Sequence, residues 1–254
     1  MSIENLPPGL RLNKYISDTG HCSRREADKL IEEGRVTING KVPELGTRVQ
    51  EGDLVAIDGQ KIGAKKAPIY IAFNKPVGIT CTTETHVKGN IISYINHPER
   101  IFPIGRLDKP SDGLIFLTND GDIVNKILRA GNNHEKEYIV TVDKAIDDSF
   151  VQRMQSSVKI LGVMTKRCKV RKEGKKRFRI ILTQGLNRQI RRMCQTLGYE
   201  VQTLQRVRIM NVTLEGLAVG KWRYLTTKEI DEINQMVANS SKTHISSDNL
   251  DDNE

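Results

Sequence analysis

The stretch Ile101–Thr118, with the sequence IFPIGRLDKPSDGLIFLT, constrains the fold more than any other part of the chain. Two short apolar runs, Ile101–Ile104 and Leu114–Thr118, flank a charged loop that also contains glycine and proline. Short apolar runs bounded by glycine and proline are typical of buried strands. We therefore predict a strand–loop–strand unit whose loop lies at the edge of a rigid sheet, where binding and catalytic groups are commonly found.

Within this loop, Gly105-Arg106-Leu107-Asp108 places a cation, an apolar residue and a carboxylate in consecutive positions. A loop aspartate beside an arginine more often forms a turn or an ion pair than a catalytic site. The pattern by itself therefore makes Asp108 a candidate, with a purely structural role as the alternative.

Composition limits the class of protein. The chain has 254 residues, of which 37% are hydrophobic and 28% are charged, as in a globular protein of one or two domains. Its net charge of +9 predicts a polyanionic partner, with a solvated basic surface as the alternative. The sequence contains no apolar run of membrane-helix length, and its first ten residues do not have the pattern of a secretory signal.

The cysteine pattern argues against disulfides and structural zinc. Cys22, Cys81, Cys168 and Cys194 are widely scattered without a CxxC pair, and the five histidines show no ligand spacing. We predict reduced thiols, a cytoplasmic protein and no metal site.

The first part of the chain, residues 10–59, has the pattern of two short helices followed by a small β-ribbon. Ser23 and Glu26 have the spacing of a capping box at the start of the second helix, and Gly34 is placed to end it. Val36–Ile38 alternates as a strand, and Asn39-Gly40 is a hairpin signal.

Basic residues cluster near the starts of these two predicted helices, at Arg11, Lys14, Arg24 and Arg25. Charge alone favours RNA binding and a solvated helix face about equally. The run from Arg11 to Gly59, with SRREADKLIEEGRVTING at its centre, resembles an S4 RNA-binding domain. The resemblance implies that the helix pair and its basic residues contact RNA.

After a short basic linker at 61–68, strands mix with helices. Alternating apolar residues predict strands at 69–73, 137–142, 178–182 and 201–213 and around Trp222, and helical spacing predicts helices at 123–128, 150–154 and 188–200. The lack of regular βαβ repetition favours an α+β sheet over a doubly wound one.

The segment 159–192 is strongly basic, with thirteen lysines and arginines and a single acidic residue, Glu173. Such density predicts a polyanion-binding surface, although its part KRCKVRKEGKKR is also compatible with a mobile basic loop. Helical spacing places Arg188, Arg191 and Arg192 on one face.

Three motifs occur in order at wide spacing: GRLD at 105–108, KEYIV at 136–140 and GLNRQIRRM at 185–193. With the S4-like start, they resemble the RsuA branch of ribosomal RNA pseudouridine synthases over residues 10–230. The resemblance implies an α+β protein with a small S4 RNA-binding domain at 8–66. A pseudouridine synthase domain with a central mixed, largely antiparallel sheet would follow at 67–235. The polar and acidic composition of 236–254, with almost nothing to bury, predicts a disordered tail.

This family breaks the N1–C1′ bond of a uridine in RNA, turns the uracil and bonds C5 to C1′. The resemblance assigns Asp108 as the catalytic carboxylate, acting without a metal or cofactor, and Arg191 as its basic partner. Tyr138 would stack on the flipped uracil, with a core aromatic as the alternative. The residues expected along the RNA are Arg106, Leu107, Asp108, Lys109, Arg188, Gln189, Ile190 and Arg191. Of these, Arg106 and Leu107 are candidates to fill or guard the space that the flipped base leaves.

The expected substrate is 23S ribosomal RNA, with a tRNA stem-loop as a second candidate, and the expected state is a monomer with no membrane partner. One alternative is a non-catalytic RNA-binding or ribosome-assembly protein, which would not require Asp108, Tyr138 and Arg191 together. Another is a hydrolytic glycosidase, which would need two carboxylates flanking the bond. The sequence leaves open the modified uridine, the choice of free RNA or ribosomal particle, the atom that Asp108 attacks and the orientation of the S4 domain.

Overall fold

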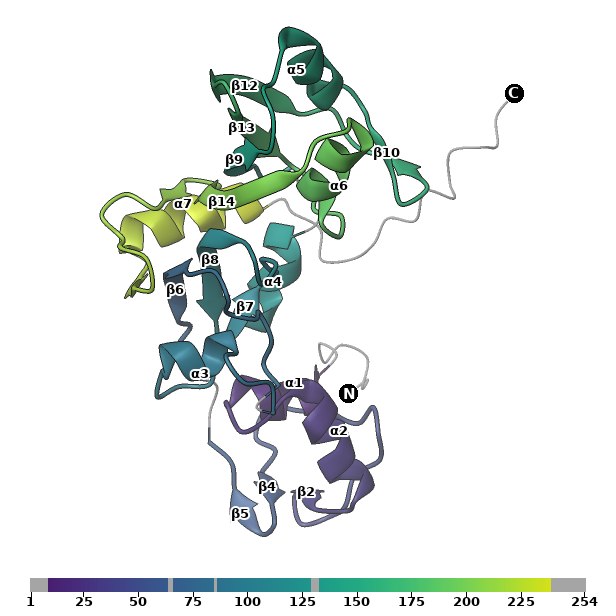
Figure 1. Cartoon of the computed structure of the whole chain (residues 1–254). Coiled ribbons are helices and arrows are strands. Elements are labelled where there is room, and N and C mark those ends of the chain that lie inside the picture. The colour runs from purple at the N-terminus through teal and green to yellow at the C-terminus, as the bar shows by residue number, and fades with distance from the viewer. Residues whose placement is uncertain (1–8, 64–65, 85, 129–132, 239–254) are drawn as a thin grey trace. The chain divides into compact units, whose positions relative to one another are not determined.

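The computed structural model describes residues 9–63, 66–84, 86–128 and 133–238 (Figure 1). The chain divides into two compact units, residues 1–68 with 97–100 and residues 69–96 with 101–254. None of the helices in the described ranges combines the length and the apolar character that crossing a membrane requires.

The first unit contains two helices and short strands. Its elements are β1 (Leu10–Arg11), α1 (Leu12–Asp18), α2 (Arg24–Glu32), β2 (Val36–Ile38), β3 (Arg48–Val49), β4 (Val55–Ile57) and β5 (Gln60–Lys61). The predicted capping box is present, because the Ser23 hydroxyl accepts from the Glu26 amide and the Glu26 carboxylate accepts from the Ser23 amide. Apolar residues of both helices and of β2, β3 and β4 form one small core.

The predicted turn at Asn39-Gly40 is confirmed, but the strand pairing around it differs from a simple hairpin. Both residues have positive φ, as a tight primed turn requires. After the turn, Lys41 forms only an isolated bridge with Ile38, and β2 pairs along its length with β4 instead. The local signal therefore specified the turn and not the partner strand.

The second unit is built on one large sheet. Its elements are β6 (Tyr70–Lys75), α3 (Ile91–Ile95), β7 (Phe102–Ile104), β8 (Asp112–Thr118), α4 (Gly121–Leu128), β9 (Lys136–Val142), α5 (Asp148–Gln155), β10 (Lys159–Ile160), β11 (Val163–Met164), β12 (Lys169–Gly174), β13 (Arg177–Leu182), α6 (Gln189–Thr196), β14 (Val201–Ile209), β15 (Val212–Thr213), β16 (Trp222–Tyr224) and α7 (Thr227–Val237). Within the described residues, nine strands pair in the order β12-β13-β9-β14-β8-β6-β16, with β15 beside β14 and β7 beside β8. Of the described pairings in this sheet, only β14 with β8 is parallel, so the predicted mixed, largely antiparallel α+β sheet is confirmed.

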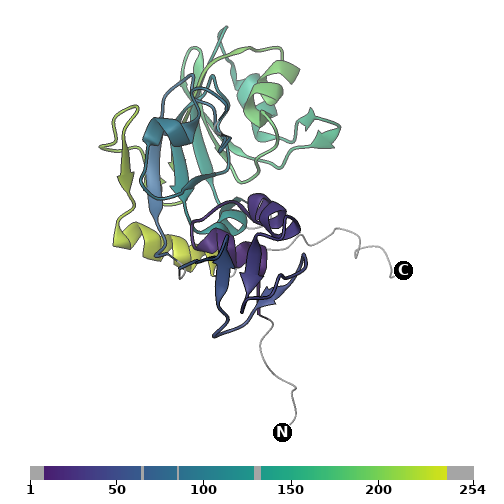
Figure 2. The ribbon, with the colours of Figure 1, turned by 90° about the horizontal axis from the view of Figure 1, so that it is seen from below.

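Helices cover the two faces of this sheet unequally. Alternating residues of β6 and β8 point to opposite faces and contribute to two separate cores. The larger core receives α5 and α6, and the smaller one receives α4 and α7; Figure 2 shows α6 and α7 on opposite sides of the sheet. Among the described residues, none of β9, β13 and β12 contributes to the smaller core, so no described helix packs through this core onto that half of the sheet.

The last helix, α7, continues beyond the domain boundary predicted at residue 235. Ile233 and Val237 are both 3% exposed, because their four-residue spacing places them together against the smaller core. The residues of the predicted acidic tail from 239 to 254 lie outside the described residues.

Candidate active site

The predicted strand–loop–strand forms and fixes the position of Asp108. β7 and β8 pair antiparallel, with Ile104 opposite Phe116. The loop between them is held by backbone bonds, since the Ser111 amide donates to the Asp108 carbonyl at 2.9 Å and the Gly78 amide donates to the Lys109 carbonyl at 2.8 Å. These contacts leave the Asp108 carboxylate half-buried on a rigid loop.

Two arginines approach this carboxylate from the sequence motif at 185–193. Arg188 Nη1 lies 3.5 Å and Arg191 Nε lies 3.8 Å from Asp108 Oδ2. Arg191 also holds the loop itself, because its Nη2 donates to Ser111 Oγ at 3.0 Å and to the Pro110 carbonyl at 3.2 Å. Burial and the neighbouring Arg188 lower the pKa of Arg191, while Asp108 opposes that shift. The structure thus brings the predicted Asp108 and Arg191 together.

The third arginine of that motif, Arg192, bonds Asn187 instead of Asp108. The helical spacing assumed from the sequence does not hold, because Arg188 precedes α6 in the left-handed conformation, with φ of 50°. Arg192 turns back to Asn187, donating to its carbonyl at 3.1 Å and to its side chain at 3.2 Å. The prediction that Arg192 shares one face with both other arginines is therefore wrong.

A cleft of about 340 Å³ opens beside Asp108, and all of the predicted residues of the catalytic unit line it except Lys109. Those that do are Arg106, Leu107, Asp108, Tyr138, Arg188, Gln189, Ile190 and Arg191. Tyr138 lies on β9 with its side chain on the covered face, 9% exposed. The ring therefore faces the cleft from a strand position that also contacts the core.

Three of these predicted RNA contacts are buried in the protein. Leu107 is 6% exposed and packs in the larger core, so it is not free to enter the space left by a flipped base. Gln189 accepts from the Leu186 amide at 3.0 Å in the turn before α6, and Ile190 is 4% exposed in the larger core. Arg106 is exposed and remains the candidate for that space.

The floor of the cleft holds two cations that the sequence analysis did not assign, Lys136 on β9 and Arg206 on β14. They are 6% and 4% exposed. Arg206 Nε donates to the Leu114 carbonyl at 2.6 Å, and its guanidinium carbon lies 6.0 Å from the centre of the Tyr138 ring. Burial, with a smaller effect of Arg206, lowers the pKa of Lys136 to about 8. The signal for Lys136 was its place two residues before Tyr138, on the same face of a strand.

The basic residues of the first unit also form a surface. Arg11, Lys14, Arg24 and Arg48 line one hollow, in which the pairing of β1 with β3 places Arg11 opposite Arg48. Lys14 is bonded to Asp18 at 2.6 Å, which offsets part of its charge, and Arg25 lies outside the hollow. Arg48 was not predicted, because only the strand pairing reveals its proximity.

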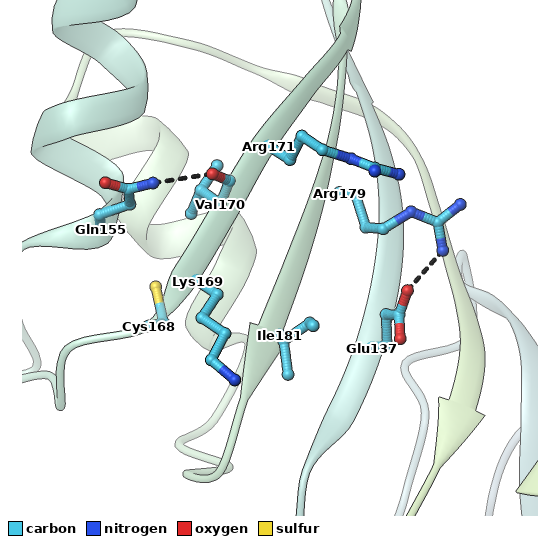
Figure 3. A pocket seen from close by; sticks show the side chains of 8 residues that line it. All are labelled: Glu137, Gln155, Cys168, Lys169, Val170, Arg171, Arg179 and Ile181. Carbon is cyan, nitrogen blue, oxygen red and sulfur yellow. Dashed lines mark hydrogen bonds and ion pairs between the residues drawn. The ribbon is translucent and has the colours of Figure 1, made fainter.

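A second, more open groove of about 590 Å³ lies on another surface of the sheet, along β12, β13 and β9 (Figure 3). Its residues Glu137 and Arg179 alternate with those that face the larger core, and Figure 3 shows Arg179 directed at Glu137. Arg179 bonds both Glu137 and Glu173 at 2.5 Å, and Arg208 bonds Glu137 at 2.6 Å. Several charges of the basic segment are therefore balanced within the protein, and the smaller cleft at Asp108 is the better candidate site.

Comparison with known proteins gives consistent matches over most of the chain. A family model for RNA pseudouridylate synthase matches residues 69–196, and an S4 domain model matches residues 10–55. The chain is 58% identical to the dual-specificity RNA pseudouridine synthase RluF of Escherichia coli (strain K12) over 234 residues, which cover 91% of this chain and 81% of that protein.

More distant relatives agree. The ribosomal large subunit pseudouridine synthase B of Bacillus subtilis (strain 168) is 34% identical over 232 residues, covering 88% of this chain and 95% of that protein. A crystal structure of a pseudouridylate synthase is similar with a TM-score of 0.66 at 27% identity, covering 89% of this chain and 100% of that one.

Proposed function

Because the chain belongs to the RNA pseudouridylate synthase family, as an RluF-like member of the RsuA branch, we propose that Asp108 is the carboxylate with which it converts uridine to pseudouridine. The activity is an isomerisation within RNA, and the S4 domain is an RNA-binding module. The proposal concerns the residues that perform the reaction and the RNA that is modified.

The observation that carries the proposal is the single carboxylate at the cleft. Among the described residues that line it, Asp108 is the only carboxylate, and it lies near Arg191 and Arg188 on one side and faces a cleft that also holds Tyr138. A hydrolytic glycosidase uses a pair of carboxylates that flank the bond. One carboxylate with nearby cations fits nucleophilic or base chemistry without hydrolysis.

The arrangement suggests how the residues divide the work. The target uridine leaves its stack and enters the cleft, where Tyr138 offers a flat surface for the uracil. Asp108 acts on the flipped nucleotide while the N1–C1′ bond breaks and the C5–C1′ bond forms, and the hydrogen of C5 is then lost. Arg191 holds the loop through Ser111 and Pro110, so it keeps the carboxylate in position during the turn of the base.

We further propose 23S ribosomal RNA as the main substrate, with a tRNA stem-loop as a second one. The relatives support this choice by name, since one is called dual-specific and another acts on the ribosomal large subunit. The hollow at Arg11, Arg24 and Arg48 would hold phosphates of the same RNA outside the cleft. The protein is expected to act as a cytoplasmic monomer.

The test is to map pseudouridine after incubating the protein with 23S transcripts, ribosomal particles and tRNA. Carbodiimide labelling followed by reverse transcription locates each new pseudouridine. Modification of one position in 23S RNA, and none with the Asp108→Asn variant, is the expected result. Release of free uracil would instead indicate hydrolysis, and binding without any modification would favour the non-catalytic alternative.

A further inference from the structure

The floor of the Asp108 cleft presents hydrogen-bond donors that the protein itself does not use. Arg206 Nη2 is buried and has no partner, although Nε of the same side chain bonds the Leu114 carbonyl. The Nζ of Lys136 makes no hydrogen bond or ion pair with the described residues, and the residue as a whole is 6% exposed where it lines the cleft. A buried donor without a partner is destabilising, so Arg206 Nη2 requires an explanation, and the ammonium group of Lys136 adds a second available donor in the same cleft.

A second buried lysine in the same sheet shows how a structural lysine differs. Lys75 on β6 is fully buried, and its Nζ donates to the Pro76 carbonyl at 2.9 Å and to the Ile79 carbonyl at 3.0 Å. Its ammonium group is therefore satisfied inside the protein. Lys136 lines the cleft instead and lacks such carbonyls, which is the arrangement expected when the partner arrives with a ligand.

The reaction supplies an anion at this place. When the N1–C1′ bond breaks, its electron pair can remain on the uracil, where it spreads over N1 and the carbonyl oxygens O2 and O4. If a nucleophile first adds to the ring, the same oxygens take the charge. Either route makes a carbonyl oxygen of the flipped base more negative than it is in the bound uridine.

We propose that Lys136 and Arg206 form a cationic site that binds the carbonyl oxygens of the flipped uracil and stabilises the negative charge that develops on the ring. This proposal rests on the assignment of the cleft as the active site. The two side chains donate hydrogen bonds and keep their protons, so the electron pair returns from the ring to form the C5–C1′ bond. A base then removes the C5 hydrogen as a proton.

The position of the two cations suits this role. Arg206 lies opposite Tyr138 in the pairing of β14 with β9, so the guanidinium and the ring that would stack on uracil share one face. Asp108 and the two arginines beside it line the same cleft as Lys136 and Arg206. His134 lies just before β9, where burial, with a smaller effect of nearby Lys136, lowers the pKa of the imidazole. A base bound in this cleft would therefore meet both the Asp108 carboxylate and the donors of Lys136 and Arg206.

The experiment compares the single-turnover rate of pseudouridine formation in four variants of the full chain at saturating enzyme. Lys136→Met keeps the length of the side chain and removes its charge, Lys136→Arg restores the charge, and Arg206→Lys keeps a cation while changing its geometry. Lys228→Met on α7 is the matched control, because the Lys228 side chain is 86% exposed and does not line the cleft. Melting curves and RNA Kd are measured on the same samples.

We expect Lys136→Met to lose at least 100-fold in rate with its RNA Kd within about threefold of the native value, because a charge-stabilising donor acts mainly in the transition state. Lys136→Arg should recover at least tenfold of that loss, and Arg206→Lys should fall by tenfold or more. The native rate should decrease above about pH 8 as Lys136 loses its proton, and Lys136→Arg should move this decrease to higher pH.

A rate for Lys136→Met within threefold of native would overturn the proposal. So would equal losses in Lys136→Met and Lys136→Arg with an unchanged pH profile, since that result indicates packing alone. Asp108→Asn in the same assay separates the two claims. If Asp108→Asn is inactive while both cation variants retain native rates, only the cationic site is wrong; if Asp108→Asn is active, the proposed function itself fails.

Discussion

Gly113 in β8 and Arg206 in β14 lie so close together that no side chain fits between them. A Cβ on Gly113 would overlap the Arg206 carbonyl oxygen and lie 2.7 Å from the Arg206 nitrogen. Gly113 also has a φ of 107°, which strains any other residue. The two residues are opposite each other in the parallel pair of the sheet, so this approach places Arg206 beside the loop that carries Asp108.

Gly113→Ala should therefore lower the free energy of unfolding by roughly 3 kcal/mol, because the backbone of β14 must move and the φ is strained. Gly216→Ala is the matched control, since Gly216 has a φ of 69° with open space around it and reports the backbone strain alone. Urea unfolding of both variants measures the difference. A loss in Gly113→Ala no larger than in Gly216→Ala would show that the close contact does not restrain the sheet.

Arg191→Lys should reduce the single-turnover rate by at least tenfold while changing RNA affinity by less than threefold. A lysine cannot reproduce the separate contacts of the guanidinium with Ser111 and Pro110, so the Asp108 loop loses its clamp. Arg192→Lys is the control, because the guanidinium group of Arg192 bonds only Asn187 among the described residues. Equal rates for the two variants would show that the contacts of Arg191 with Ser111 and Pro110 do not contribute to the reaction rate.

The ion pair between Arg223 on β16 and Glu229 on α7 should make stability depend on pH. Both guanidinium nitrogens of Arg223 lie 2.8 Å from the carboxylate, and this bonding lowers the pKa of Glu229 below its ordinary value of 4.5. Since the folded pKa is lowered, the stabilisation is present above the unfolded pKa and is lost as the pH falls through the folded one.

Glu229→Gln should therefore cost about 1 kcal/mol at pH 7, and the difference from the native protein should shrink as the pH falls below 4.5. Glutamine still allows the capping box with Thr226, so the change isolates the charge. Urea titrations between pH 7 and pH 3 give both values. A cost that stays constant over this range would show that the charge of Glu229 is not responsible.

Arg48→Gln should weaken RNA binding several-fold and reduce the slope of log K against log salt by about 1, as expected for the loss of one phosphate contact. Arg48 shares its hollow with Arg11 and Arg24. The control is Lys41→Gln, an exposed lysine of the same unit that does not line the hollow. If both variants have the same salt dependence, RNA does not use this hollow.

The sequence predicted the features that depend on neighbouring residues. The capping box of Ser23 and Glu26, the strands on either side of Asp108 and the inward face of Tyr138 follow from local spacing, and all are present. The motif resemblance predicted that Arg191 lies beside the Asp108 loop. The two are distant in sequence, since Arg191 bonds Pro110 of that loop across 81 residues.

The features that were missed depend on pairing between distant strands or on unusual backbone conformations. Arg206 reaches the cleft only through the register that places it opposite Tyr138. The left-handed Arg188 interrupts the helical spacing that had grouped Arg192 with it. Leu107 was a candidate to fill or guard the space left by the flipped base, and only the folded core shows that it is buried.

The most direct test of the central claim uses RNA labelled with tritium at uracil C5, because pseudouridine formation must expel that hydrogen. Native protein, Asp108→Asn and the control Asp112→Asn are compared on 23S transcripts, with RNA affinity measured in parallel. Asp112 bonds Gln205 and does not line the cleft, so its variant should keep its activity. The assignment predicts tritium release by the native protein and Asp112→Asn, and none by Asp108→Asn at an RNA affinity within about threefold of native. Substantial release by Asp108→Asn would contradict it.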